Sequence, residues 1–437
     1  MKRSSTSSPN DAVPCLARVL EARVSFRSQS FLRPLKLSTG TIHSITEAVA
    51  SVTVDLGGVR STGKGAIYLS DLWAWPDASR SHEERDGILR DICSTMAAEM
   101  PEWCGQSAHP LEHGLLLHSR CGAFVEVPAL ASAMCASPFD AALHDAVGLA
   151  MGKSAFRLYD EDMPVPSADR FFKGGSATAA VRRCVRKAPL EAVPGWYLVG
   201  GLDDLGDGFA EWAARFSRFK IKVAGREAMA DAVRVSEVFR RARECGCGAP
   251  LLSLDSNEGN PDEASVGAFL DELERLDSEA SRALAYLEQP TGRDISRAAF
   301  DWSRIAGRKP VYLDEGLTSL DLLPLAKSQG WSGLALKPCK GHSFLLCSAA
   351  WAVENGLSLV LQDLTNPGLA ALHSWLVAAH LPTENGIELN SPQFTPTANA
   401  GFLPALEPLF HPVDGIHRLG MPVPAGLGSR LEASRPH

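Results

Sequence analysis

Five short apolar segments between Phe219 and Lys337 end in ionisable residues, and this repeat constrains the fold more than any other feature of the sequence. The ionisable residues recur at intervals of about 23 to 33 residues, the length that a strand, a crossover helix and two loops occupy. They are Lys222, Asp255, Glu288, Asp314 and Lys337. The repeat predicts consecutive βα units with one charged side chain at the carboxyl end of each strand. In a (β/α)8 barrel these ends converge on one face, where catalytic residues lie.

The rest of the chain completes this pattern. Its predicted strands lie at 219–223, 251–255, 285–290, 310–315 and 333–338, with further strands at 196–199, 358–362 and 386–389. Before about residue 160 the sequence indicates strands followed by helices, with a turn at Gly57-Gly58 and helices over 81–96 and 138–151. We therefore predict an N-terminal α+β region followed by a barrel of parallel strands.

Composition restricts the partners of the protein. The formal net charge of −8 argues against nucleic acid, which requires a basic face. The sequence has no apolar run of roughly 18 or more residues, so we expect no membrane-spanning helix. The polar, Ser-rich residues 1–10 resemble a disordered tail and not a secretion signal. Ten cysteines show no disulfide or zinc framework, and the close pair Cys245 and Cys247 is best interpreted as a loop with reduced thiols, which are typical of the cytoplasm.

Asp255, Glu288 and Asp314 come from three consecutive predicted strand ends. Three carboxylates that meet repel one another unless a cation lies between them. An all-oxygen set of carboxylates suits Mg2+ or Mn2+ and not zinc. We therefore predict a Mg2+ site, with Mn2+ as an alternative, and expect Asn257 to support one of the ligands by hydrogen bonding.

Lys222 and Lys337 are expected to flank this metal, because the second and sixth strands face each other across a barrel of eight. Lys220 points to the same side of its strand as Lys222, so its charge is expected to lower the pKa of Lys222, while the carboxylates act in the opposite direction. A lysine that loses its proton near neutral pH can act as a general base. Two such lysines can remove a proton from one face of a metal-bound carboxylate substrate and return it to the other, while the metal stabilises the enediolate.

Each of these motifs alone also has an ordinary structural interpretation. A single Glu-Gln-Pro or Asp-Glu-Gly at a strand end is usually a capped or turning loop. The ordered set, with one ionisable residue in each βα unit, arises far less often by accident. The set as a whole therefore favours the metal site.

The same residues resemble the enolase superfamily, and within it the muconate-lactonizing-enzyme subgroup. The resemblance extends over most of the chain and rests on Lys220-Ile221-Lys222, Asp255-Ser256-Asn257, Glu288-Gln289-Pro290, Asp314-Glu315 and Lys337. It implies Mg2+-dependent abstraction of a proton α to a carboxylate, with Glu315 beside the metal or the substrate. It also implies a homo-oligomer and a capping domain whose mobile loops, at about 31–40 and 63–73, close over the substrate.

With this resemblance, we predict an α/β protein with a modified, (β/α)7β-like TIM barrel and an α+β N-terminal capping domain. The helix over 138–153 resembles the one that joins these two domains in the family. The predicted boundaries are a disordered tail at 1–15, the capping domain at 16–165, the barrel at 166–391 and a C-terminal segment at 392–437 that packs on the capping domain.

Three positions near the last strands depart from subfamilies of known reaction. Dipeptide epimerases carry Asp-x-Asp on the eighth strand, where this chain has Glu388, so Glu388 either holds a substrate cation or is an ordinary polar strand end. Asp363 after the seventh strand either binds a substrate ammonium or hydroxyl or caps the next helix. His342 is a less favoured candidate for substrate contact. Lys337 on the sixth strand, without a His at the seventh, excludes the mandelate-racemase branch.

The favoured function is racemisation or epimerisation of a small carboxylic acid, because both lysines are present. The alternatives within the superfamily are a cycloisomerase or a dehydratase, in which one lysine is the base and the other only stabilises charge. The alternative outside enzymes is a catalytically inactive metal-binding relic. A relic is expected to have lost at least one ligand or lysine, and the sequence retains all of them.

Overall fold

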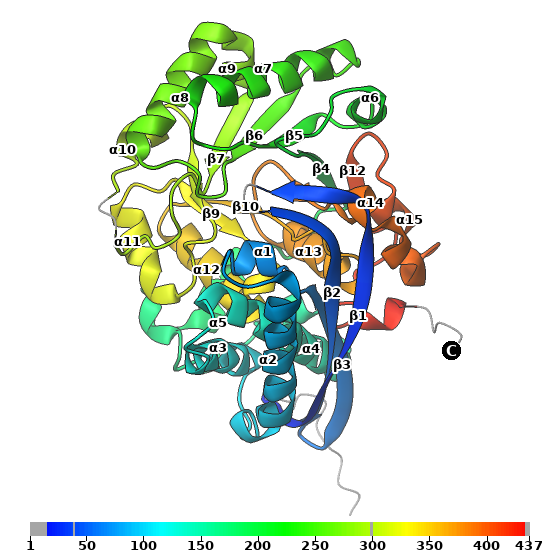
Figure 1. The fold of residues 1–437 in the computed structure, drawn as a ribbon. Coiled ribbons are helices and arrows are strands. Elements are labelled where there is room, and N and C mark those ends of the chain that lie inside the picture. The colour runs from blue at the N-terminus through cyan, green and yellow to red at the C-terminus, as the bar shows by residue number, and fades with distance from the viewer. Residues whose placement is uncertain (1–14, 38–39, 298–299, 433–437) are drawn as a thin grey trace, which may run out of the picture.

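A computed structural model of the 437-residue chain describes residues 15–37, 40–297 and 300–432. A three-stranded antiparallel sheet and several helices form its N-terminal part, and a closed barrel of parallel strands follows (Figure 1). The predicted combination of an α+β N-terminal part and a barrel is confirmed. No helix in the described part of the chain has both the length and the hydrophobicity that crossing a membrane requires.

The N-terminal sheet is built from three long strands in sequence order: β1 (Arg18–Leu37), β2 (Gly40–Leu56) and β3 (Val59–Tyr68). Gly57 and Gly58 form the predicted turn between β2 and β3, and both have positive φ, as a two-residue hairpin of this twist requires. The predicted loop over 31–40 is wrong where it is described, because β1 continues to Leu37 and β2 begins at Gly40. A register shift between Ser30 and Leu35 lets the strand continue past Pro34; residues 38–39 lie outside the described part.

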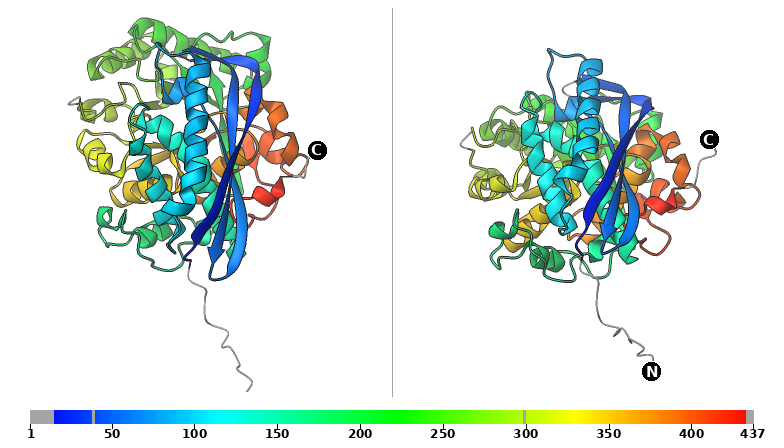
Figure 2. Two further views of the ribbon diagram at one scale, coloured as in Figure 1. Left: turned by 60° about the horizontal axis from the view of Figure 1, so that its bottom comes forward. Right: turned by 90° about the horizontal axis from the view of Figure 1, so that it is seen from below.

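Helices cover one face of this sheet (Figure 2). Ser81 and Glu84 form a capping box at the start of α2, so the predicted helix at 81–96 is confirmed and extends further. The predicted helix at 138–151 begins earlier, at Ala129, with Pro138 inside it. Its first turns are buried and rich in Ala, a strong helix former, which offsets the cost of the backbone hydrogen bond that the proline removes. The helices are α1 (Asp71–Ala74), α2 (His82–Trp103), α3 (Pro110–Arg120), α4 (Ala129–Met151) and α5 (Ala177–Cys184).

Eight parallel strands form the barrel, and it is closed because the last strand pairs with the first. Each strand lies at a predicted position. They are β4 (Ala192–Val199), β5 (Arg218–Lys222), β6 (Leu251–Asp255), β7 (Leu284–Glu288), β8 (Val311–Leu313), β9 (Gly333–Leu336), β10 (Ser358–Leu361) and β11 (Ile387–Glu388). The connecting helices are α6 (Asp207–Ala213), α7 (Ala228–Glu244), α8 (Glu263–Leu276), α9 (Ser278–Ala283), α10 (Ser303–Ala306), α11 (Leu323–Ser328), α12 (His342–Glu354) and α13 (Gly368–His380).

Alternation along the strands fills the barrel and aims the charged residues. Trp196, Tyr286 and Tyr312 pack together with Ala335 and Val360 in its interior. Two residues further along their strands, on the same face, come Glu288, Asp314 and Lys337. The aromatic layer is therefore a floor beneath the ionic residues at the carboxyl ends of the strands.

The C-terminal segment returns to the N-terminal part of the molecule (Figure 2). It contains α14 (Ser391–Phe394), α15 (Glu407–Phe410) and β12 (Ile416–Arg418), and β12 pairs antiparallel with β4. The buried carboxylate of Asp145 on α4 accepts hydrogen bonds from the backbone of Lys64, Leu427 and Ser429. These bonds connect the C-terminal segment to α4 and β3. The domain boundaries near residues 15, 165 and 391 stay predictions.

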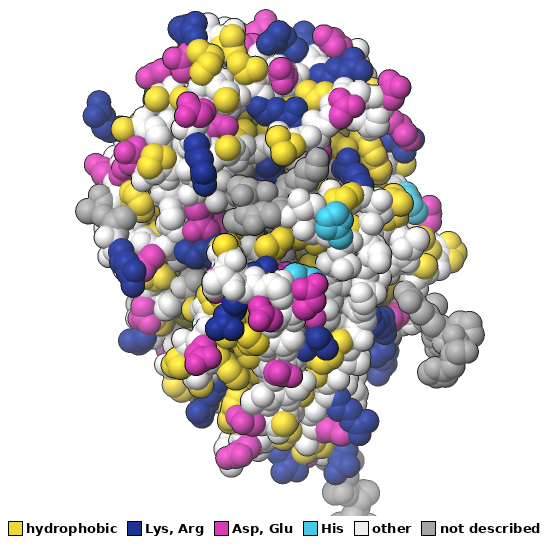
Figure 3. Space-filling view, in the orientation of Figure 1, with side chains coloured by type: hydrophobic (Ala, Val, Ile, Leu, Met, Phe, Trp, Pro, Cys, Tyr) yellow, Lys and Arg dark blue, Asp and Glu magenta, His cyan; other side chains and the backbone are white. Residues whose placement is uncertain are grey.

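Charge on the outer surface is mixed. On the face drawn in Figure 3, Lys and Arg side chains are interspersed with Asp and Glu over the barrel and the N-terminal helices. Inside the barrel, by contrast, buried lysines and carboxylates lie close together at the carboxyl ends of the strands.

Candidate active site

The ionic residues of the repeat lie together at the carboxyl ends of β5 to β9. Lys222 pairs in register with Asp255, and Asp255 with Glu288. Asp314 and Lys337 directly follow β8 and β9. In the closed order of eight strands, β5 and β9 lie opposite each other. Lys222 and Lys337 therefore reach the carboxylates from opposite sides of the barrel.

Two of the three carboxylates are hydrogen-bonded to the candidate base lysines. Lys222 Nζ donates to Asp255 Oδ2, and Lys337 Nζ donates to Asp314 Oδ2 at 2.5 Å. Within residues 15–37, 40–297 and 300–432, no group of three or more His, Cys, Asp or Glu side chains is arranged around a common metal position. The lysine ammonium groups lie next to the carboxylates. The assignment of Asp255, Glu288 and Asp314 as metal ligands therefore stays a prediction.

The three carboxylates have the chemistry that a hard divalent cation requires. Burial raises the pKa of Asp255 and Asp314, but the lysines outweigh it: Lys222 brings the pKa of Asp255 to about 2, and Lys337 brings that of Asp314 below its usual value. Burial, aided by the two neighbouring aspartates, raises the pKa of Glu288 well above its usual value. Buried acidic oxygens that are stable only beside positive charge form a donor set that fits Mg2+.

Asp314 is shared between Lys337 and Lys340, a residue for which the sequence predicted no role. Lys340 Nζ donates to the backbone carbonyl of Asp314 at 2.6 Å. It also lies 3.0 Å from Asp314 Oδ1, yet that oxygen accepts no well-aligned hydrogen bond. An acidic oxygen without a hydrogen bond is an available ligand atom for a cation.

The electrostatics of Lys337 differ from the expectation of a lysine that loses its proton near neutral pH. Burial lowers the pKa of Lys337, but the Asp314 and Glu288 carboxylates outweigh burial and raise the pKa above its usual value. The physical reason is that both carboxylates direct their charge at the ammonium. A cation shared among the carboxylates would compete for that charge.

Lys220 is enclosed by side chains of the barrel and is 1% exposed. Its ammonium donates to Glu288 Oε1 at 2.9 Å, to Gln362 Oε1 at 2.5 Å and to Glu388 Oε2 at 2.7 Å. The cation that Glu388 holds is thus Lys220 of the same chain, and Asn390 donates to its other oxygen at 2.8 Å. Burial lowers the pKa of Lys220, but Glu288 and Glu388 outweigh it and raise the pKa well above its usual value.

Gln362 was missed from the sequence, although alternation along β10 identifies it. Val360 points into the barrel, so Gln362 does as well and Asp363 points away. Asp363 accepts hydrogen bonds from the backbone and side chain of Asn366 and from Ser374. It forms a turn and does not cap α13, whose preceding residue is Pro367. Burial raises the pKa of Asp363 to about 7.

His342, the less favoured candidate for substrate contact, packs among other buried histidines. It is buried, with Nδ1 2.8 Å from His373 Nε2, and its ring packs against His144 of α4. His342 is the first residue of α12, and its side chain lies in the interface between α4, α12 and α13. Sequence spacing alone does not show this, because the interface forms between distant segments.

Asn257 and Glu315 connect the two sides of the site. Asn257 Oδ1 accepts from Lys222 Nζ at 3.0 Å, and Asn257 Nδ2 donates to Glu315 Oε1 at 3.1 Å. The indole N–H of Trp73 donates to the same Glu315 oxygen at 2.8 Å. Burial, together with Asp314, raises the pKa of Glu315 to about 7. Asn257 Nδ2 also donates to Asp255 Oδ2 at 3.3 Å, and Trp73 is a contact from the N-terminal part.

The predicted mobile loop over 63–73 is wrong in its first half. Gly63 and Gly65 are in β3 and lie directly against α4, where a Cβ on Gly65 would meet the Pro138 carbonyl oxygen at 2.1 Å. The second half contains the short helix α1, which carries Trp73 to the site. Beside it lies an apolar cluster formed by Phe31, Ile42, Ile45, Tyr68, Leu72, Leu198 and Phe394.

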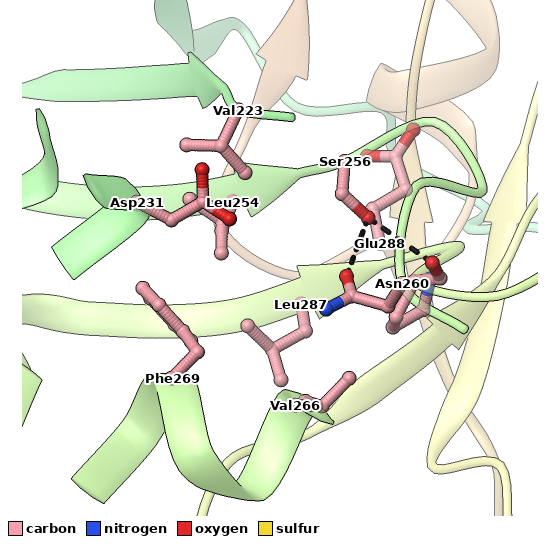
Figure 4. Close-up of a pocket in the computed structure, with 10 residues that line it drawn as sticks. Val223, Asp231, Leu254, Ser256, Asn260, Val266, Phe269, Leu287 and Glu288 are labelled. Carbon is pink, nitrogen blue, oxygen red and sulfur yellow. Dashed lines mark hydrogen bonds between the residues drawn. The ribbon is translucent and has the colours of Figure 1, made fainter. Parts of the chain in front are cut away.

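A small cavity lies on the helix side of the barrel wall (Figure 4). Leu254 and Leu287, which alternate with the ionic residues of β6 and β7, line it together with Val266 and Phe269 of α8. Ser256 donates a hydrogen bond to Asn260 at 2.9 Å at its edge. This cavity lies between the barrel strands and α8. It is distinct from the mouth of the barrel, where the lysines lie.

No family model and no curated protein matches the sequence. Solved structures match the fold over nearly the whole chain. An enolase from Bradyrhizobium, complexed with magnesium and mandelic acid, is 17% identical over 95% of this chain and 96% of its own, with a TM-score of 0.63. A muconate lactonizing enzyme from Mycobacterium smegmatis, complexed with muconolactone, is 15% identical over 94% of this chain and 96% of its own, with a TM-score of 0.64.

A third match is a dipeptide epimerase from Enterococcus faecalis, complexed with Mg and the dipeptide L-Leu-L-Tyr. It is 16% identical over 94% of this chain and 99% of its own, with a TM-score of 0.61. The chain has the enolase-superfamily fold. The resemblance inferred from the motifs is confirmed at this level. In this enolase-superfamily fold, the ends of β5 to β9 carry the lysines and carboxylates described above.

Proposed function

We propose that the protein is a Mg2+-dependent enzyme that removes the proton α to a carboxylate, and that it racemises or epimerises a small carboxylic acid. The observation that carries the proposal is the placement of Lys222 and Lys337 at the ends of opposite strands, with buried carboxylates between them. Two bases on opposite faces of one carbon provide the geometry for inverting it. The fold shared with racemases, epimerases and cycloisomerases supports the reaction class.

Asp255, Glu288 and Asp314 are the proposed Mg2+ ligands. Their acidity and burial support a hard cation, and magnesium is named with the matched structures from Bradyrhizobium and Enterococcus faecalis. Bound there, Mg2+ supplies positive charge that stabilises the negative charge developing on the substrate carboxylate.

The proton steps belong to the lysines. One lysine, as the neutral amine, accepts the α-proton at Nζ, and the opposite lysine, as the ammonium, donates a proton from Nζ to the other face. Asn257 orients Lys222 through its 3.0 Å hydrogen bond. Lys220 remains an ammonium among Glu288, Gln362 and Glu388 and supplies fixed positive charge below the reacting carbon.

Isotope exchange tests the reaction class. We expect both enantiomers of one acid, in a panel of N-acyl amino acids, dipeptides and acid sugars, to exchange the α-proton for deuterium in D2O with Mg2+. Lys222→Ala and Lys337→Ala should each lower exchange by about 100-fold or more for one of the two enantiomers, since each removes one base. Lys327→Ala, on the outer helix α11, is the matched control and should exchange as the unaltered protein does.

The outcomes of this experiment separate the alternatives. Exchange from one enantiomer only, with loss in one lysine variant, supports a cycloisomerase or dehydratase and contradicts racemisation. Mg2+ binding without exchange of any acid supports the inactive metal-binding relic. Unaltered exchange in Lys222→Ala contradicts the role of this lysine as a base.

A further inference from the structure

Trp73 reaches the candidate active site from the N-terminal part of the chain. It lies on α1, directly after the long strand β3, and is 7% exposed. Its indole ring covers Lys337, with Nζ 4.6 Å from the ring centroid. Its indole N–H donates to Glu315 Oε1 at 2.8 Å. One side chain therefore touches a proposed base and an acidic neighbour of a proposed metal ligand.

The oxygen that Trp73 contacts is also bound from the other side of the site. Glu315 Oε1 accepts a hydrogen bond from Asn257 at 3.1 Å, and Asn257 accepts one from Lys222 at 3.0 Å. The contacts form an unbroken path from Lys222 through Asn257, Glu315 and Trp73 to Lys337. The ring plane of Trp73 is thus set by groups on the barrel, although the residue itself precedes the barrel.

The backbone of Trp73 is held on both sides as well. Asp71, at the start of α1, pairs with Arg85 of α2 at 2.8 Å, and both are buried. From the barrel, Arg293 donates to the carbonyl of Trp73 at 3.3 Å while its guanidinium is paired with Glu258. These bonds hold α1 between α2 and the barrel. The position of the indole is therefore determined by several contacts and not by one.

We propose that Trp73 is the positioning residue of Lys337. The negative face of the indole attracts the ammonium and holds it against Asp314, and the hydrogen bond to Glu315 keeps the ring at the angle at which it covers Nζ. The ring also excludes water from this side of Lys337. The inference rests on the proposed function for the importance of Lys337, but the position of this lysine is measurable without turnover.

Competitive labelling of the intact protein tests the contact directly. Trace acetic anhydride acetylates accessible amines, and mass spectrometry of a digest gives the labelling of Lys337 relative to Lys222 in each variant. Trp73→Leu, which removes ring and N–H, should raise this ratio by about threefold or more, because the lysine loses a cation–π partner and its cover. Trp73→Phe, which keeps a ring face but no N–H, should give a smaller rise.

Trp212→Phe is the matched control, because this indole packs on Tyr197 outside the barrel. Its labelling ratio should equal that of the unaltered protein. An unchanged ratio in both Trp73→Leu and Trp73→Phe overturns the proposal. An equal rise at Lys337 and Lys222 overturns it too, because that result indicates a general loosening of the structure. If Trp73→Leu fails to fold by circular dichroism, Trp73→Phe decides alone.

Exchange of the α-proton supplies a second readout that a merely structural role would not produce. The loss in Trp73→Phe should fall mainly on the enantiomer whose exchange Lys337→Ala abolishes, and an equal loss for both enantiomers overturns the positioning role. If Lys337→Ala exchanges normally, the proposed function fails, while the labelling ratio still decides whether Trp73 positions Lys337.

Discussion

Buried charge is the controlling quantity at the scale of single residues. Asp255, Glu288 and Asp314 are almost excluded from water, where an isolated carboxylate is strongly disfavoured. The lysines at the neighbouring strand ends supply the compensating charge in the structure described here. If a metal ion replaces the lysine beside a buried carboxylate, the negative charge must still be compensated. The charge of each acidic side chain therefore matters for binding the cation.

Glu288 provides a direct test of the metal site. Glu288→Gln keeps the shape of the side chain but removes its negative charge, so we expect the affinity for Mg2+, measured by isothermal titration calorimetry without substrate, to fall by at least about tenfold. Asp231→Asn is the control, because Asp231 is a buried carboxylate on α7 that binds backbone N–H groups outside the barrel. Equal Mg2+ affinity in Glu288→Gln and the unaltered protein would remove Glu288 from the ligand set.

At the scale of elements, the close contact of β3 with α4 determines how the N-terminal sheet meets the rest of the molecule. Gly63 and Gly65 point at this helix, and a Cβ on Gly63 would meet the Ala146 nitrogen at 2.2 Å. Because these residues lack side chains, the strand lies directly on the helix backbone. β3 then leads into α1, so this contact also determines where Trp73 reaches the barrel.

Gly65→Ala should therefore destabilise the protein. The added methyl group has no space against the Pro138 carbonyl, and we expect the free energy of unfolding to fall by about 1–3 kcal/mol in a denaturant titration. Gly87→Ala is a control of opposite sign: Gly87 lies in α2 with nothing within 4 Å of an added Cβ. It should gain about 0.5–1 kcal/mol from helix propensity. Equal stability of the two variants would contradict the close packing of β3 on α4.

At the scale of the whole molecule, buried histidines lie where the N-terminal helices meet the barrel helices. His342 on α12 contacts both His144 on α4 and His373 on α13, and the carboxylate of Asp140 lies beside His144. His380 of α13 stacks on Phe156 nearby. Burial lowers the pKa of His373 to about 4, although Asp140 acts in the opposite direction. The interface therefore contains neutral imidazoles.

The pKa of His373 gives a prediction with a defined sign. Unfolded, this histidine takes up a proton below about pH 6.5, whereas folded it does so only near pH 4, so its neutral burial costs stability as the pH falls between these values. From pH 7 to pH 5 this amounts to roughly 2 kcal/mol. His373→Gln should reduce the loss of unfolding free energy between these pH values by about that amount. His411→Gln, at the exposed residue that follows α15, is the control and should not reproduce this change. An unchanged pH dependence in His373→Gln would contradict the prediction.

The sequence by itself determined the barrel and the residues at its mouth. The strands at β5 to β9 and their ionisable ends were predictable because each is a local apolar run closed by a charged residue, and equal βα units bring such ends to one face. Gly57-Gly58 was predictable because few residues accept positive φ at both turn positions. Alternation along β10 likewise places Gln362 on the same face as Val360, inside the barrel.

Only the tertiary structure decided which groups these side chains contact. Trp73 and Lys337 are distant in the chain, and the pairing of Glu388 with Lys220 joins the last barrel strand to the second. The burial of His342 and the continuation of β1 past Pro34 likewise depend on what packs against them. Local pattern records the preference of a segment for water or for the core, whereas the partner of a buried polar group is set by closure of the barrel and by docking of the N-terminal part.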